Sequence, residues 1–308
     1  MNQYDNFAIK EEDVIRANAM SGRENEWRLL RSLKIPKFFN DPPQNISTKR
    51  GLVVDVETTG LSENDDVIEL AMLPFDYDAE TGLIFEVHQP FEAFQEPRVP
   101  INEDAALVHG ITYEMVAGNS IDVTSVESIV CNVDLIVGHN AAFDRPKLEK
   151  QWECFVDKHW ACSLTLIDWF REGMNARNLE YLGQQFGWIQ ESHRALSDCE
   201  NCLAVLAQKL PKSGRRVMSV LRQKAVEDKY LVIAARTDYE RRAMLRNRGY
   251  MWRGADKEPG RVWWKVSSDY EVERGWLESE IYGYTGASIR KYEINGRDRY
   301  TDRIWNFA

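Results

Sequence analysis

The chain has 308 residues, enough for two domains plus extensions. Its hydrophobic content of 44% is ordinary for a soluble globular protein, and no apolar run reaches the roughly 18 residues of a membrane span. The five cysteines do not form a secretory disulfide pattern, and residues 1–5 lack the basic and apolar regions of a signal peptide. These features predict a cytoplasmic protein with no membrane partner.

An N-terminal extension and linker is predicted for residues 1–48. It begins with polar residues, and a helical pattern follows around Trp27, Leu30 and Leu33. Two prolines in residues 41–45 end this pattern and predict a linker. A compact domain is therefore expected to begin at residue 49.

Two acidic residues, Asp55 and Glu57, follow an apolar run at residues 51–54 that predicts a buried strand. Side chains alternate across a strand, so both acids project from the same face. Two neighbouring carboxylates at the end of a buried strand repel each other and lose hydration, and a cation is the usual compensation. This segment therefore predicts a divalent metal site.

Two further acids lie where a metal site would need them. Asp144 lies between a predicted strand at residues 135–137 and a helix whose first turn contains Pro146. Taken alone, Asp144 is equally typical of a helix N-cap, a role that does not exclude metal binding. Asp198 opens a helical pattern with apolar residues at three- and four-residue spacings.

Together these segments resemble the three exonuclease motifs of the DEDDh family of 3′-to-5′ exonucleases, which includes the epsilon subunit of bacterial DNA polymerase III and ribonuclease T. The resemblance covers about residues 50–210, and all three motifs occur in order. A sister subgroup has a tyrosine four residues before the last aspartate, where this chain has Arg194. The matching residues are Asp55 and Glu57 in the first motif, His139, Asn140, Phe143 and Asp144 in the second, and His193 and Asp198 in the third.

The resemblance implies hydrolysis of phosphodiester bonds with two divalent metal ions, Mg²⁺ or Mn²⁺, which are hard ions that prefer oxygen ligands. The expected ligands are Asp55, Glu57, Asp144 and Asp198, with Asp55 bridging both ions. His193 is the expected general base, since imidazole titrates near neutral pH. On one ideal helix, His193 and Asp198 would lie about 140° apart. His193 is therefore expected in the loop before the helix, or in a loop that moves.

Contacts to the terminal nucleotide are expected from residues near the first two motifs. Phe143 could present its ring to a base or sugar. For His109 and Phe143 the alternatives are a turn residue and core packing. The residues expected to bind substrate are Thr58, Thr59, Gly60, His109, Asn140 and Phe143.

The expected function is a 3′-to-5′ exonuclease that acts on the 3′ end of DNA and releases nucleoside 5′-monophosphates. RNA is the alternative substrate, because family members with the same motifs cut both DNA and RNA. The 2′-OH distinguishes RNA from DNA, and no residue of this sequence indicates whether a 2′-OH is recognised. A proofreading subunit that works only within a polymerase assembly is a further alternative. An inactive binding subunit would be expected to lack a ligand, and this chain lacks none. For the assembly state of the protein, a homodimer and a complex with a polymerase-associated partner are both alternatives.

The expected fold is ribonuclease H-like, with a mixed five-stranded sheet flanked by helices, over residues 49–210. Glu69, in the second strand, could face the site or lie at an edge. Cys199 and Cys202 are read as buried thiols within a helix. Strands are predicted near residues 51–57, 67–75, 83–90, 134–138 and 159–163, and helices near 101–107, 123–131, 145–156, 163–172, 178–186 and 195–209.

A basic, Trp-rich C-terminal α+β domain is predicted for residues 211–308. Residues 1–210 contain 18 Lys+Arg and 35 Asp+Glu, whereas residues 211–308 contain 21 and 14. Basic groups interleaved with aromatic rings are typical of single-stranded nucleic acid binding, and protein docking is the alternative. The pattern around Leu245, Gly249 and Trp252 resembles a small domain appended to some bacterial and phage exonucleases.

Overall fold

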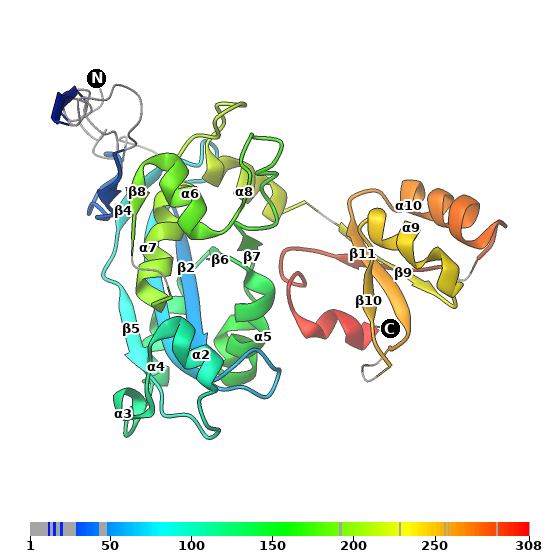
Figure 1. Cartoon of the computed structure of the whole chain (residues 1–308), viewed down its shortest axis with the longest axis horizontal. Coiled ribbons are helices and arrows are strands. Elements are labelled where there is room, and N and C mark those ends of the chain that lie inside the picture. The colour runs from blue at the N-terminus through cyan, green and yellow to red at the C-terminus, as the bar shows by residue number, and fades with distance from the viewer. Residues whose placement is uncertain are drawn as a thin grey trace. The chain divides into compact units, whose positions relative to one another are not determined.

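A computed structural model describes residues 12, 15–16, 19–20, 29–42, 48–190, 193–227, 229–255, 257, 259–287 and 289–307 of the chain. The chain divides into two compact units, Met1–Lys224 and Ala225–Ala308. Figure 1 labels the helices and strands of each unit.

A mixed sheet forms the centre of the first unit (Figure 1). The sheet has six strands, one more than the five predicted, because β5 at residues 91–94 was not foreseen. Five strands follow the order β4-β3-β2-β6-β7, and β5 pairs with β3. β2 is antiparallel to β3 and parallel to β6, which is parallel to β7. The strands are β2 (Thr48–Thr58), β3 (Val67–Asp78), β4 (Ile84–Val87), β5 (Phe91–Phe94), β6 (Leu135–Gly138) and β7 (Trp160–Cys162).

Helices cover this sheet, and residues 52–54 of β2 are buried without alternation, as expected for a strand covered on both faces. The helix that carries Asp144 contacts β2 and β6, and the helix that carries Asp198 contacts β2 and β3. The sheet and these helices form the predicted ribonuclease H-like arrangement. The helices are α2 (Glu103–His109), α3 (Tyr113–Val116), α4 (Val123–Val130), α5 (Ala141–Gln151), η1 (Glu153–Phe155), α6 (Leu179–Phe186), α7 (Ala195–Leu206) and α8 (Val217–Ala225).

The helix predicted at residues 163–172 is wrong, because the chain forms successive turns there. Trp169 is fully buried, and its indole Nε1 donates a hydrogen bond to the Ser163 carbonyl oxygen at 2.8 Å. The Asp168 carboxylate accepts the Arg171 N–H at 3.1 Å, a local bond that competes with helix formation. The apolar residues of this segment therefore enter the core from turns.

The helical pattern expected near Leu30 and Leu33 is also wrong for residues 29–33. There the chain forms strand β1 (Arg31–Ser32), which pairs in parallel with β8 (Trp188–Ile189). Tertiary pairing overrides local propensity in this segment. Trp27 and residues 43–45 of the expected linker lie outside the described residues, whereas residues 12, 15, 16, 19 and 20 are helical.

The two units divide after Lys224, later than the expected boundary at residue 211, because α8 packs with the first unit. Val217, Met218 and Leu221 of α8 are fully buried. The helix also passes so close to the turn between β3 and β4 that a Cβ on Gly82 would lie 2.3 Å from the Ser219 nitrogen. Among the described residues, no helix has the length and hydropathy needed to cross a membrane.

The second unit contains an antiparallel sheet in the order β10-β11-β9-β12. Trp263 faces a core that includes Val232 and Leu245, and Trp264 faces the other side, near Trp305. Apolar clusters thus lie on both faces of the sheet. The elements are β9 (Lys229–Ala235), η2 (Tyr239–Arg241), α9 (Arg242–Asn247), β10 (Met251–Arg253), β11 (Val262–Ser267), α10 (Tyr270–Trp276), the π-helix η3 (Leu277–Tyr282), β12 (Ile289–Ile294) and η4 (Asp302–Phe307).

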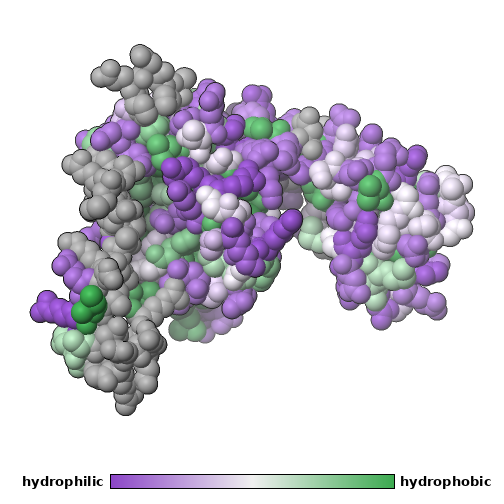
Figure 2. All heavy atoms as spheres, turned by 90° about the horizontal axis from the view of Figure 1, so that it is seen from above, coloured by the Kyte–Doolittle hydropathy of each residue, from purple (hydrophilic) through white to green (hydrophobic). Residues whose placement is uncertain are grey.

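The face of the molecule seen in Figure 2 is predominantly hydrophilic, and its apolar residues form small separate groups. Dispersed apolar residues of this kind are normal on a protein surface.

Candidate active site

Three of the four acids from the sequence motifs meet at one end of β2. One carboxylate oxygen each of Asp55, Glu57 and Asp198 lies within 4.8 Å of the others. Asp55 and Glu57 are two residues apart on β2, and Asp198 lies in the first turn of α7. Because α7 packs against β2 and β3, its first turn brings Asp198 to this strand end.

Asp144 adjoins this cluster from the first turn of α5, although it lies outside the 4.8 Å set of described residues. Its side chain is buried, and its negative charge contributes to raising the pKa of Asp55. A Cβ on Gly138 would lie 3.2 Å from the Asp144 Oδ2, so this β6 residue leaves the acid room. The structure therefore gathers all four predicted acids in one region.

The pKa values of all four carboxyl groups are raised. Burial is the main cause, and it raises the pKa of Glu57 to about 8. Burial, and then the charges of Asp144 and Asp198, raise the pKa of Asp55 well above its usual range. The pKa values of Asp144 and Asp198 are also raised by burial, against the effect of backbone hydrogen bonds. Buried, mutually repelling carboxylates are a donor set suited to hard divalent cations.

His193 lies in the turn directly before α7, as its offset from Asp198 requires. The residue is exposed, and its φ of 66° is in the left-handed region. Its backbone N–H donates a hydrogen bond to the Asp198 Oδ2 at 3.0 Å. The same carboxylate therefore faces the acid cluster and holds the backbone of His193.

An ion pair between a buried glutamate and a half-exposed arginine, which the sequence did not assign, fixes the start of α7. The Glu69 side chain on β3 is fully buried, and its Oε1 accepts a hydrogen bond from the Arg194 Nη2 at 2.8 Å. Its Oε2 accepts the Ala195 backbone N–H at 3.1 Å. The visible signal was a glutamate inside an apolar strand, since such a residue is seldom buried without a partner.

The expected substrate residues that follow Glu57 form a compact turn. The Thr58 hydroxyl donates to the Gly60 carbonyl oxygen at 2.6 Å, and the Thr59 hydroxyl donates to the Asp65 Oδ1 at 3.1 Å. A Cβ on Gly60 would lie 2.8 Å from the Asp65 Oδ2, so a larger residue would push away the Asp65 carboxylate that accepts the Thr59 hydroxyl. Both threonine hydroxyls thus hold the turn that leads away from the acid cluster.

The remaining expected substrate residues come from two helices. His109 ends α2 and is buried, and its Nδ1 accepts the Ile111 N–H at 3.0 Å. Burial lowers the pKa of His109, and the nearby His193 and Arg194 contribute to this effect. Asn140 is the exposed N-cap position of α5, with a φ of 99°. The ring of Phe143 is half-buried, 5.2 Å from the Lys147 Nζ.

His139, which matches the second motif, is bonded within the protein through both ring nitrogens. Its Nδ1 lies 2.7 Å from the Ser163 hydroxyl, and its Nε2 lies 2.9 Å from the Arg177 carbonyl oxygen. Since a carbonyl can only accept, Nε2 carries the proton and Nδ1 accepts from Ser163. Burial lowers the pKa of His139 to about 4, so a neutral ring ties β6 to the segments that follow β7.

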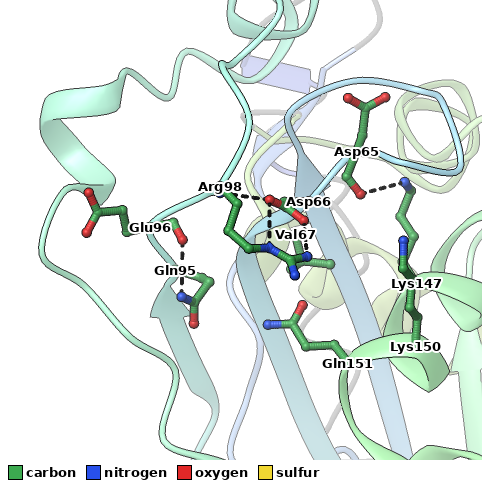
Figure 3. Close-up of a pocket in the computed structure, with 9 residues that line it drawn as sticks. All are labelled: Asp65, Asp66, Val67, Gln95, Glu96, Arg98, Lys147, Lys150 and Gln151. Carbon is green, nitrogen blue, oxygen red and sulfur yellow. Dashed lines mark hydrogen bonds and ion pairs between the residues drawn. The ribbon is translucent and has the colours of Figure 1, made fainter.

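A separate cavity of about 390 Å³ lies between the turn after β2 and α5, and the four acids do not line it (Figure 3). The Lys147 Nζ donates to the Ser62 and Asp65 carbonyl oxygens at 2.9 and 3.3 Å, which ties this turn to α5. The lining residues are Asp65, Asp66, Val67, Gln95, Glu96, Arg98, Lys147, Lys150 and Gln151.

Taken together, the fold and the four gathered acids define a ribonuclease H-like domain of the DEDDh exonuclease class with a divalent-metal type of site. Residues 52–206, half of the chain, match the model of the RNase T family, described as exonuclease. The chain belongs to this exonuclease family.

The curated relatives with similar sequences are much longer proteins. The PolC-type DNA polymerase III of Listeria monocytogenes is 32% identical over 199 residues, which are 60% of this chain and 13% of the polymerase. The PolC-type enzyme of Bacillus subtilis is 28% identical over 192 residues, 59% of this chain and 13% of that protein. The chain thus spans about an eighth of the length of these relatives.

Solved structures of two exonucleases also resemble the chain. Exonuclease X in complex with 5′ overhanging duplex DNA is 24% identical, with a TM-score of 0.43, and the match covers 57% of this chain and 99% of that one. Exonuclease I of E. coli in complex with a dA16 oligonucleotide is 17% identical, with a TM-score of 0.44 and coverages of 61% and 48%.

Proposed function

We propose that this protein is a metal-dependent 3′-to-5′ exonuclease that removes nucleoside 5′-monophosphates from the 3′ end of DNA. The observation that carries this proposal is the convergence of Asp55, Glu57 and Asp198 within 4.8 Å, with buried Asp144 beside them. Membership of the exonuclease family supports the same activity.

In this proposal Asp55, Glu57, Asp144 and Asp198 would hold two divalent ions, Mg²⁺ or Mn²⁺. When bound, two such ions stabilise the charge on the attacking and leaving oxygens of a phosphodiester. Burial raises the pKa of Glu57 to about 8, and a carboxyl group must be deprotonated to ligate a metal ion. The affinity of the site for a divalent cation is therefore expected to rise with pH up to about 8.

His193 acts as the general base in this mechanism. Its exposed side chain stands before α7, and the bond from its N–H to Asp198 keeps it beside the acid cluster. A ring nitrogen takes a proton from the attacking water, a role for which imidazole is suited at neutral pH. Thr58, Thr59, Gly60, His109, Asn140 and Phe143 surround the terminal nucleotide, with contacts through backbone groups where the hydroxyls are already bonded.

Amide replacement of the central acid tests the proposal. Asp55→Asn keeps the shape of the side chain but removes its charge, so turnover of a 3′-labelled single-stranded DNA is expected to fall at least about 100-fold. The matched control is Asp134→Asn, which removes an exposed acid paired with Lys49. Turnover by Asp55→Asn at the wild-type rate, with circular dichroism unchanged, would exclude this site.

A matched set of oligomers decides the substrate. DNA and RNA of one sequence, each single- and double-stranded, are compared at a single enzyme concentration. We expect DNA to be degraded faster, in keeping with the polymerase relatives, which are named as DNA polymerases. Faster degradation of RNA would make the protein an exoribonuclease.

A proofreading role within a polymerase assembly is the second candidate, because the relatives in which this region recurs are polymerases. Affinity capture from cell extract, followed by light scattering of the purified protein, separates the cases. Recovery of a polymerase supports proofreading. A monomer or homodimer that degrades DNA with no polymerase recovered supports a free-standing nuclease.

A further inference from the structure

A row of aromatic rings and guanidinium groups crosses the second unit, well separated in sequence from the exonuclease motifs. It consists of Tyr239, Arg242, Arg246, Trp263 and Trp252, which we name the Arg–Trp strip. The Arg242 guanidinium lies 3.6 Å from the centre of the Tyr239 ring, and that of Arg246 lies 5.7 Å from the Trp263 ring. The Trp263 and Trp252 rings are 5.3 Å apart. The strip therefore runs from η2 along α9 to the edge of the sheet.

The local fold explains this alignment. Arg242 and Arg246 are one turn apart on α9, so they lie on one side of the helix. Trp252 and Trp263 are directly opposite each other on β10 and β11, so they share one face of the sheet. Because β10 is the edge strand, Trp252 stands at the border of that face.

Two rings of the strip are exposed to solvent and are not packed in the core of the unit. Trp263 is only 6% exposed and packs in the apolar cluster with Leu245. By contrast, Trp252 is 50% exposed and Tyr239 is 76% exposed. The exposed Trp252 ring lies against the buried Trp263 ring and so has little side-chain freedom to lose when a base stacks on it, whereas Tyr239 is contacted by the Arg242 guanidinium.

Charge is distributed unevenly along the unit. Residues 236–265 contain nine basic and four acidic residues, whereas residues 269–280 contain one and five. Arg248 and Lys265 are already paired with Glu273. Within the described residues, no acidic side chain forms an ion pair with Arg242 or Arg246. Two arginines of the strip thus remain available for an anionic ligand.

We propose that the Arg–Trp strip binds single-stranded nucleic acid. Unstacked bases stack on Tyr239 and Trp252, and backbone phosphates lie against Arg242 and Arg246. Stacking needs bases whose faces are free, which a duplex does not offer, and arginine binds phosphate without reference to sequence. The binding does not depend on the exonuclease activity. If the proposed exonuclease acts on the same strand, the strip also raises the local concentration of that strand.

Equilibrium binding to the full chain tests the proposal. Fluorescence anisotropy of a labelled 15-residue oligothymidylate is measured with EDTA present, so that metal-dependent cleavage does not contribute. Trp252→Ala is expected to weaken binding roughly 5- to 150-fold, the usual range for loss of one stacked base. Trp252→Phe keeps a ring and is expected to retain most of the affinity. Arg242→Ala/Arg246→Ala should make the slope of log affinity against log salt shallower by about 1.4 for two lost phosphate contacts.

The matched control is Arg274→Ala, which removes one positive charge from α10, where Arg274 is paired with Glu271. It is expected to bind as the wild type does. Wild-type affinity for both Trp252→Ala and Arg242→Ala/Arg246→Ala would overturn the proposal. An equal loss of affinity in Arg246→Ala and in Arg274→Ala would also overturn it, because the effect would then be one of total charge. A failure of the exonuclease proposal would appear separately, as unchanged turnover by Asp55→Asn, and leaves these binding results unaffected.

Discussion

The two histidines of the second and third motifs differ in how the protein engages them. His139 is bonded through both ring nitrogens to Ser163 and Arg177. His193 is held through its backbone N–H and is exposed. The motif resemblance implied a catalytic role for His193 and none for His139, and the contacts of His139 make it a structural residue.

Replacement of His193 tests its role as a base. His193→Asn is expected to lower kcat by roughly 10²- to 10⁴-fold, the usual contribution of general acid–base catalysis. Asparagine tolerates the left-handed backbone at this position. His88→Asn, which removes an imidazole paired with Asp76, serves as the control and should keep the wild-type kcat. A wild-type kcat for His193→Asn would assign the base to another group.

The burial of His139 predicts a pH-dependent stability. Its pKa is lowered to about 4 in the folded protein, so the unfolded chain binds this proton more readily than the native protein does. The free energy of unfolding is therefore expected to fall as the pH is lowered from about 6.5 through about 4. The raised pKa values of the four acids act in the opposite direction, which is why the comparison is made between variants.

Urea unfolding of wild type and His139→Gln at pH 7.0, 5.5 and 4.5 measures this contribution. Glutamine can donate to Arg177 but does not titrate, so the stability difference between the two proteins should shrink as the pH falls. A constant difference across the three pH values would contradict the assignment.

At the residue scale, the gathering of the acids could be predicted because each acid lies in a recognisable exonuclease motif, although Asp55, Asp144 and Asp198 are far apart in the sequence. The pairing of Glu69 with Arg194 could not be predicted in this way, because neither residue is one of the matching motif residues and only the folded sheet brings the partners together across 125 residues.

At the scale of the elements, hydrogen bonds to the sheet hold the first residues of α7 in position. Its first residues are joined to β3 by the bonds of Arg194 and Ala195 to Glu69. His193 directly precedes Arg194, and Asp198 lies one turn later. Movement of this helix end would displace the proposed base and a proposed metal ligand together.

The two partners of this ion pair should differ in what their loss costs. Arg194→Ala leaves a fully buried carboxylate and is expected to lower the free energy of unfolding by roughly 3 kcal/mol. Glu69→Gln leaves Arg194, which is 39% exposed, in contact with water and is expected to cost about 1–2 kcal/mol. Because either change loosens the helix end, kcat should fall roughly 10- to 100-fold.

A double-mutant cycle checks this account by urea unfolding. Arg194→Ala/Glu69→Gln removes the buried charge along with its partner, so it should be less destabilised than the sum of the single changes. Strictly additive losses would indicate that the two side chains contribute independently.

Most strands and helices lie close to the residue ranges predicted for them, because the spacing of apolar residues follows which side chains are buried. β3 was predicted at residues 67–75 and occupies Val67–Asp78, and α6 was predicted at 178–186 and occupies Leu179–Phe186. The errors arose where burial was achieved without regular structure, as in the turns around Trp169. They also arose where a short segment was paired by a distant strand, as in β1.

On the scale of the whole molecule, each unit has its own buried apolar residues. Val232, Leu245 and Trp263 pack in the second unit, and Ile68, Ile111 and Val116 pack in the first. The acids of the metal site belong to the first unit alone. The two units are therefore expected to respond differently to divalent cations.

Calorimetry is expected to resolve two unfolding transitions, and only one should shift with metal. A ligand that binds the native state at 100 times its Kd adds about 2.7 kcal/mol of stability, so Mg²⁺ should raise the Tm of the first unit. The transition of the second unit should stay in place. Asp55→Asn should reduce the shift, and equal shifts of both transitions in Mg²⁺ would contradict a site confined to the first unit.

The positive φ of 66° at His193 also determines which replacements the position accepts. Glycine adopts this conformation at little cost and asparagine adopts it readily, whereas valine, isoleucine and threonine are strained by their branched Cβ. In a saturation library, abundance of folded protein should therefore follow backbone preference, with glycine and asparagine high and the branched residues low. Nuclease activity should follow ring chemistry and be confined to histidine, so comparing the two rankings separates loss of fold from loss of the base.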